Sequence, residues 1–195
     1  WCYLSTGRIE KLKANFDINV TLVHFPLHPD TPMEGKSLES LFKGRGDPKA
    51  MYAQMKALMD AEGLPYGQRT HTYNSRLAQE LGKWVDDFSL PGGSTQADAF
   101  HDAMYRAYFV DGKNIADEDS LVALAVGVGL PEEEAREVLK SRRFQQAVDD
   151  DWAKSREYGV TGVPTFVAGG HGVVGAQPYE ALEGLLTQVG ATPRN

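Results

Sequence analysis

The sequence predicts an α/β fold that carries a large all-helical insertion, and two observations lead to this class. Residues 2–29 have the pattern of an amphipathic helix followed by a strand buried on both faces, an order typical of a parallel sheet. From residue 47 to 143 the signals are almost all helical. A helix, two short strands and a closing helix follow, so we assign 1–46 and 144–195 to the α/β domain and 47–143 to the insertion.

The α/β domain begins with one helix and one strand. Apolar residues recur one or two helical turns apart in the first stretch, with charges between them, at Leu4, Ile9, Leu12 and Phe16. This spacing predicts an amphipathic helix over about 2–15. The run INVTLVHFPLHP at 18–29 is rich in β-branched and aromatic residues and nearly continuous in apolar character, as expected of a strand buried on both faces.

The remaining elements have clear boundary signals. DPKAMYAQMKALMDAEG at 47–63 begins with an Asp N-cap and a Pro at the first helical position, and it ends at a Gly. Four more helical segments follow in the insertion, at 74–88, 95–112, 117–129 and 131–144. A further helix ends at Gly159, two short strands surround a Gly-rich turn within 160–177, and Pro178 opens the closing helix.

Composition and charge exclude several classes of partner. The 195 residues are 42% hydrophobic and 24% charged, as in soluble globular proteins, and no apolar run approaches the roughly 20 residues that span a bilayer. The formal charge of −7, with Lys and Arg scattered among acids, argues against nucleic acid. One cysteine cannot form an internal disulfide and no signal peptide precedes Trp1, so a cytoplasmic location is expected.

Cys2 is the first candidate for chemistry. It lies at the predicted start of a helix, between Trp1 and Tyr3, where unpaired backbone N–H groups would stabilise a thiolate. Free cysteine is also among the most buried residue types, so simple packing is the commoner role for such a residue taken alone. The sequence leaves both roles open at this point.

The second candidate is the stretch GVTGVPTFV at 159–167. Proline removes a ladder hydrogen bond, so within an apolar β run it is usually confined to an edge or a bulge. The Val163–Pro164 bond is a candidate for the cis isomer, which would present an unpaired backbone edge beside the helix start at Cys2. A plain edge-strand start at Pro164 explains this stretch equally well when it is taken alone.

Together these stretches resemble the DsbA-like thioredoxin family, and within it the FrnE subgroup, which is related to 2-hydroxychromene-2-carboxylate isomerase and kappa-class glutathione transferase. The family's active site is a CPWC stretch followed by Tyr-Leu-Gly, and residues 1–4, WCYL, match the last two residues of CPWC and the Tyr-Leu after them. The similarity continues at 25–35, 107–117, 159–166 and 173–182. The resemblance implies a thioredoxin-like fold with a large all-helical insertion, whose first strand would lie upstream of residue 1.

The resemblance also implies a thiol–disulfide oxidoreductase of which this chain shows half the cysteine pair. Cys2, beside Trp1, would be the second, resolving cysteine, and the nucleophilic cysteine would lie two residues before Trp1. The sequence therefore departs from the family pattern at the decisive place. We interpret this departure as an N-terminal truncation, and a natural Ser-x-x-Cys variant stays open.

A substrate-binding loop is implied by the same resemblance. Val163 would offer its backbone to a substrate peptide, Pro164 would be the cis-proline packed against the sulfurs, and Thr161 and Gly162 would shape the loop. Proline lacks an N–H and so keeps a competing donor away from the sulfurs. The expected partners are protein or small-molecule thiols and disulfides; no cofactor is expected, and a homodimer is left open.

Two other functions stay open. Glutathione-dependent isomerases and kappa-type transferases resemble this layout with a serine in place of the first cysteine, and they activate the thiol of bound glutathione. Those relatives usually lack a cysteine at the position of Cys2, so its presence favours the oxidoreductase. The third function is that of a non-catalytic relative that keeps only the peptide-binding groove.

His24 and His28 give a weak indication of a metal site. Their even spacing would point both side chains to one face of the predicted strand. No second cysteine and no acid pair accompanies them, so we expect no metal. The thioethers of Met51, Met55 and Met59 share one predicted helix face, which suits plain core or an apolar groove for substrate.

Overall fold

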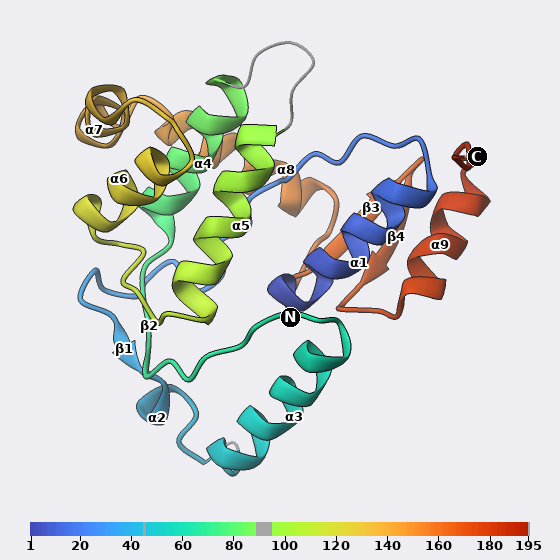
Figure 1. The fold of residues 1–195 in the computed structure, drawn as a ribbon, viewed down its shortest axis with the longest axis horizontal. Helices are drawn as coiled ribbons and strands as arrows, with labels where there is room; N and C mark the ends of the chain where they lie inside the picture. Colours follow the sequence, from blue (N-terminus) through green and yellow to red (C-terminus); the bar gives the residue numbers. More distant parts are fainter. Residues whose placement is uncertain (45, 89–94, 195) are drawn as a thin grey trace.

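The computed structural model describes residues 1–44, 46–88 and 95–194, and three parts can be followed in Figure 1. At one end of the molecule lie two helices and a β-hairpin: α1 (Cys2–Asn15), β3 (Thr165–Ala168), β4 (His171–Val174) and α9 (Tyr179–Gln188). At the other end lies a helical bundle: α4 (Arg76–Phe88), α5 (Thr95–Phe109), α6 (Glu118–Gly127), α7 (Glu132–Ser141) and α8 (Gln145–Glu157).

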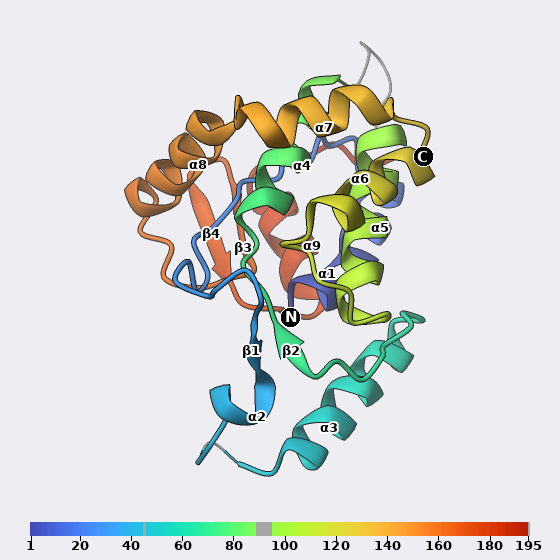
Figure 2. The ribbon, with the colours of Figure 1, turned by 90° about the vertical axis from the view of Figure 1, so that its left-hand side faces the viewer.

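The third part is an arm that lies below the N-terminus in the views of Figures 1 and 2. It consists of β1 (Lys36–Ser37), α2 (Leu38–Leu41), α3 (Pro48–Ala61) and β2 (His71–Thr72). β1 and β2 pair antiparallel, with Ser37 opposite His71, so the two ends of the arm meet where it joins the body. This ribbon was not predicted, because two residues are too few to show a strand periodicity.

Two of the predicted helix starts, those of α3 and α6, are confirmed by local hydrogen bonds. The Asp47 carboxylate accepts a hydrogen bond of 3.0 Å from the Lys49 N–H, and Pro48 occupies the first position of α3. The Asp117 carboxylate accepts one of 2.8 Å from the Ser120 N–H at the start of α6. Boundary residues of this kind act through near neighbours in the chain, so the sequence predicts them well.

The helical bundle has one continuous apolar core, with α4 in contact with α5, α6, α7 and α8. Its fully buried side chains include Leu81, Val85, Phe100, Leu121, Val138 and Leu139. The apolar residues of α4 recur at helical spacing, which gives this helix a single stripe facing its neighbours. The core of the insertion is therefore separate from the packing around α1.

One carboxylate, Glu80, is fully buried inside this bundle. Arg76 Nε donates to it at 2.7 Å, and Arg142 donates through Nε and Nη2 at 2.6 and 2.7 Å. Burial alone would raise the pKa of Glu80, but the hydrogen bonds from Arg142 and Arg76 together outweigh burial and lower the pKa. Glu80 thereby ties α4 to the connection between α7 and α8, where Arg142 lies in the left-handed region with a φ of 54°.

At the other end of the molecule, both short strands predicted around the Gly-rich turn are confirmed. β3 and β4 form an antiparallel hairpin in which Thr165 lies opposite Val174. Under the hairpin, Leu12 of α1 and Phe16, the residue directly after α1, form a small apolar cluster with Leu182 of α9. The hairpin and the two helices therefore pack as one layer of sheet and one layer of helix.

The strand predicted at 18–29 is not formed in the described structure. Residues 17–25 are drawn out, but the backbone N–H groups of 19–23 donate no hydrogen bond to any described residue, and Val20 and Val23 are 38% and 39% exposed. A strand exists only through hydrogen bonds to a neighbour, and here the neighbouring space is a groove. The expected parallel pairing is consequently missing, and both sheets of the described chain are antiparallel.

The buried carboxylate predicts a stability effect. Replacing Glu80 by Gln (E80Q) should lower the free energy of unfolding by about 3 kcal/mol, the lower end of the range for a broken buried pair, because Arg142 stays 42% exposed. Urea denaturation measures this. The control is E132Q, which removes an exposed pair with Arg136 and should change the free energy of unfolding by less than about 0.5 kcal/mol.

The E80Q effect should also depend on pH. Because the folded state holds the pKa of Glu80 below the unfolded value of about 4.3, the stabilisation is complete above that value. It should disappear as the pH falls through the folded pKa. The difference in stability between the wild-type protein and E80Q should therefore shrink in acid, and a difference that grew on acidification would contradict the assignment.

Candidate active site at the start of α1

A groove of about 1030 Å³ lies between the extended segment 17–25 and β3. Side chains of α1 and α9 also line it, and the lining is largely apolar, with Ile9, Leu12, Val23, Phe166, Leu182 and Leu186 among its residues. Cys2, from the first turn of α1, and Pro164, directly before β3, line the same groove. The sulfur and the proline loop, which are more than 150 residues apart in the chain, therefore share one cavity.

Cys2 is the first residue of α1, and Trp1 is its N-cap. The Cys2 side chain is half-buried and free. Burial raises the pKa of the thiol, and a backbone hydrogen bond only partly offsets this. The helix start was expected to favour a thiolate, but in this structure burial outweighs that effect and Cys2 is held as a thiol. Trp1 is 53% exposed and lies outside the groove lining.

The loop before β3 is fixed by its own hydrogen bonds. The Val163–Pro164 peptide bond is cis. The Thr165 hydroxyl donates to the Gly162 carbonyl at 2.7 Å, and the Gly175 N–H donates to the Pro164 carbonyl at 2.8 Å. Val163 and Pro164 are half-buried in the groove wall, whereas Thr161 is exposed.

The structure therefore places three of the six predicted site residues in the lining of the groove and three outside it. Cys2, Val163 and Pro164 line the groove. The three others are not part of its lining: Trp1, Thr161 and Gly162. Gly162 still takes part in the loop, because its carbonyl accepts the bond that orders the turn into β3.

An aromatic stack joins Cys2 to the helical insertion. The fully buried ring of Tyr3 stacks on Tyr105 at 5.8 Å and on Phe109 at 5.7 Å between ring centroids. Burial raises the pKa of Tyr105, so its hydroxyl stays protonated. Tyr105 and Cys2 also line the same groove.

The contact that Tyr105 and Phe109 make with Tyr3 of α1 was not predicted from the sequence. Their spacing on α5 fits helix core in any context, so no local signal reveals this contact. Arg69, whose guanidinium lies over the rings of Tyr108 and Phe109, was not predicted either, because nothing near it in the sequence marks it.

The two histidines lie in different environments. Burial lowers the pKa of His24 to about 4, with the carboxylate of Asp151 acting in the opposite direction. His28 is exposed and lies at a φ of 54°. In the described part of the chain, no three His, Cys, Asp or Glu side chains lie together as metal ligands would.

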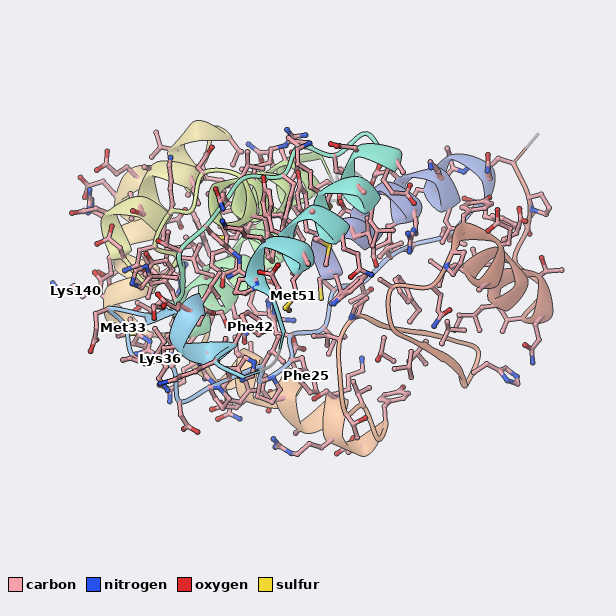
Figure 3. All side chains as sticks on the ribbon, turned by 90° about the horizontal axis from the view of Figure 1, so that it is seen from below. Phe25, Met33, Lys36, Phe42, Met51 and Lys140 are labelled. Carbon is pink, nitrogen blue, oxygen red and sulfur yellow. The ribbon has the colours of Figure 1, made fainter. Side chains whose placement is uncertain are left out.

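The methionines of α3 do not share one environment. Met59 is buried beside Tyr3 and Leu4, Met55 packs against them, and Met51, near the start of α3, is 39% exposed (Figure 3). No described helix is long and apolar enough to cross a membrane.

A thioredoxin fold with a helical insertion, carrying a cysteine at the start of its first helix and a proline loop beside it, defines a class of redox-related proteins. The family model described as DSBA-like thioredoxin domain matches residues 1–187, and the chain belongs to this family. The fold class predicted from the sequence is thereby confirmed. A comparison with curated proteins found no match.

Solved structures with the same fold cover nearly the whole chain. A 2-hydroxychromene-2-carboxylate isomerase is 19% identical, with a TM-score of 0.73 over 96% of this chain and 89% of that one. A protein of Nitrosomonas europaea, described as a candidate protein disulfide isomerase, is 18% identical, with a TM-score of 0.69 over 96% and 90%. The cytosolic disulfide reductase DsbM from Pseudomonas aeruginosa, solved with GSH, is 18% identical, with a TM-score of 0.63 over 97% and 93%.

The environment of Cys2 predicts slow modification. Because burial raises the thiol pKa, iodoacetamide should label Cys2 in the native chain at least about tenfold more slowly at pH 7.5 than in the urea-unfolded chain. The native rate should rise further with pH than the unfolded rate, since more of the native titration lies above neutrality. Mass spectrometry of timed samples measures both rates, and native labelling as fast as unfolded labelling would show that Cys2 is an accessible, reactive thiolate.

Proposed function

We propose that this chain is a thiol–disulfide oxidoreductase that uses a Cys-x-x-Cys pair, with Cys2 as the second, resolving cysteine. The observation that carries the proposal is that Cys2, at the first turn of α1, and the Val163–Pro164 loop line one groove. The raised pKa of Cys2 supports the resolving role, because that sulfur acts after the substrate is bound and needs no standing negative charge. Family membership supports the reaction class.

The proposed exchange runs in two steps. The thiolate of the first cysteine attacks a substrate disulfide, forms a mixed disulfide and releases one substrate sulfur as a thiolate. Cys2 then loses its proton and attacks the sulfur of the first cysteine, which releases the second substrate sulfur as a thiolate. The substrate gains two electrons and the cysteine pair becomes a disulfide. The reverse sequence oxidises a dithiol, and neither direction needs a cofactor.

The groove supports a place for the first cysteine. Among the residues that the structure describes, β3 pairs with β4 along one edge only, and across the groove the backbone N–H groups of 19–23 have no partner. We propose that an extended segment ahead of Trp1 lies between them as the first strand of the thioredoxin-like sheet. Such a strand would hydrogen-bond to both neighbours and end beside Cys2, which places a residue two positions before Trp1 next to Pro164.

The proline loop would bind the substrate. In this proposal the backbone of Val163 pairs with an extended substrate peptide, Pro164 packs against the sulfurs, and Thr161 and Gly162 hold the loop. The stretches quoted for the FrnE subgroup are our reason for placing the chain in that subgroup. Because DsbM is described as cytosolic, we also propose a cytoplasmic location.

A glutathione-dependent isomerase or transferase is the second candidate. The structural likeness to 2-hydroxychromene-2-carboxylate isomerase favours it. In that case a serine would stand two residues before Trp1, and the reacting sulfur would come from glutathione. Alkylation of the full-length protein with and without reduction separates the two: two labels that appear only after reduction support the cysteine pair, and one label in both conditions supports the second candidate.

The resolving role of Cys2 predicts a trapped intermediate. Full-length protein with Cys2→Ser, treated with oxidised glutathione, should accumulate a mixed disulfide with one glutathionyl group, because no second sulfur remains to release it. Intact mass spectrometry should show the adduct, and dithiothreitol should remove it. Steady-state disulfide reduction should fall to background.

The matched control is the wild-type protein under the same conditions, in which the adduct should be short-lived and an internal disulfide should form. Cys2→Ser protein that kept the wild-type turnover rate would overturn the resolving role. Such a result would favour chemistry at a single sulfur.

A further inference from the structure

The extended segment 17–25, which forms one wall of the groove, is joined to the helical bundle by few contacts. The His24 N–H donates to the Asp151 carboxylate of α8 at 3.0 Å, and the Gln79 side chain of α4 donates to the Phe25 carbonyl at 3.3 Å. Within the described residues, these are the two hydrogen bonds between the segment and the bundle. The place of this wall therefore depends on His24 and its neighbour Phe25.

The ring of His24 packs between α4 and α5. A Cβ atom at Gly82 of α4 would lie 3.5 Å from His24 Nε2 and 3.2 Å from Cε1 of His101 on α5, so both rings lie over the bare backbone of Gly82. His24 Nε2 is fully buried and has no hydrogen-bond partner among the residues that the structure describes. The close packing that holds the ring thus leaves one of its nitrogens unsatisfied.

The charged groups around the ring do not supply a partner for Nε2. Burial is the largest effect on His24 and lowers its pKa to about 4; Asp151 and Asp86 raise this pKa, whereas His101 and Lys83 lower it. Both carboxylates already have other partners. Asp151 is paired with Lys83 at 3.3 Å, and Asp86 is hydrogen-bonded to His101 at 2.8 Å. The ring of His24 is therefore neutral in the folded protein at neutral pH.

This place suits a neutral ring and not a charged one. A neutral imidazole can carry its single proton on Nδ1 and leave Nε2 bare, whereas a charged imidazole carries an N–H on both nitrogens. In His24 the second N–H would lie on the buried Nε2, where a charged donor without an acceptor is costly. Protonation is consequently favoured only where the ring reaches water, and this requires the segment to leave the bundle.

We propose that His24 is an acid-sensitive latch, whose neutral ring holds the segment 17–25 against the helical bundle and whose protonated ring releases it. A released histidine has its ordinary pKa of about 6.5, well above the value in the closed state, so the open state takes up the proton first as the pH falls. Between pH 7 and pH 5 the ratio of open to closed protein should rise about 20-fold. Opening would move Val23 and Phe25, which line the groove, so the latch couples access to the groove to pH.

Hydrogen–deuterium exchange of the full-length protein, followed by mass spectrometry, tests the latch. After correction for the intrinsic effect of pH on exchange, peptides that cover residues 18–27 should lose about 20-fold in protection between pH 7 and pH 5. Peptides from α6 and α7 serve as an internal reference and should change by less than about threefold.

Two variants separate the latch from a general effect of acid. His24→Phe keeps a ring but removes the titration, so its peptides over 18–27 should change by less than about threefold between the two pH values. The matched control is His28→Asn, because His28 is exposed and its φ of 54° suits Asn; this variant should keep the whole 20-fold change, to within about twofold. Wild-type protection that did not change with pH would overturn the proposal, and so would a His24→Phe protein that kept the wild-type change.

The titration of the His24 ring, followed by NMR in the wild-type protein, is a second test that needs no variant. The ring should titrate below about pH 5 in the folded protein, because its charged form must first be released from the bundle. Titration at the ordinary value of about 6.5 in a folded protein would show that the closed state accepts the charge, and would overturn the latch.

Discussion

The packing of Tyr3 between α1 and α5 is the contact on which the arrangement of the site depends. The Tyr3 ring is fully buried and stacks on Tyr105 and Phe109, while Met59 of α3 closes the same cluster. All three parts of the molecule meet there: the α/β layer, the helical bundle and the arm. Cys2 precedes Tyr3 directly, so its place in the groove follows from a buried neighbour rather than from any bond of its own.

Burial and charge act against each other around this cluster. The first turn of α1 offers unpaired N–H groups that favour an anion, yet the aromatic packing that positions Cys2 also removes water from it, and the pKa rises. The site thus holds a protonated sulfur in largely apolar surroundings.

The sequence predicts the elements whose causes are local. Asp47 with Pro48, and Asp117 with Ser120, set helix starts through atoms a few residues away, and the hairpin at 165–174 follows from its own Gly-rich turn. The prediction of a strand at 18–29 was wrong because a strand needs a neighbouring strand to pair with, and composition does not reveal whether one is present. In the described residues, a groove lies beside this segment. The contacts of Tyr105 with α1 and of Arg69 with α5 were not predicted for the same reason, because the partners are distant in the sequence.

The two candidate functions use the same groove and differ in the origin of the reacting sulfur, which belongs either to an internal cysteine or to glutathione. Both candidate functions need a reacting sulfur beside Pro164 at the start of α1. Both also need the substrate to be held in a fixed orientation. An internal cysteine arrives already oriented by the strand that carries it, whereas a glutathione thiol must be oriented by contacts remote from its sulfur. Cys2 can release a mixed disulfide, and this ability is useful only where a mixed disulfide forms. For this reason we favour the oxidoreductase.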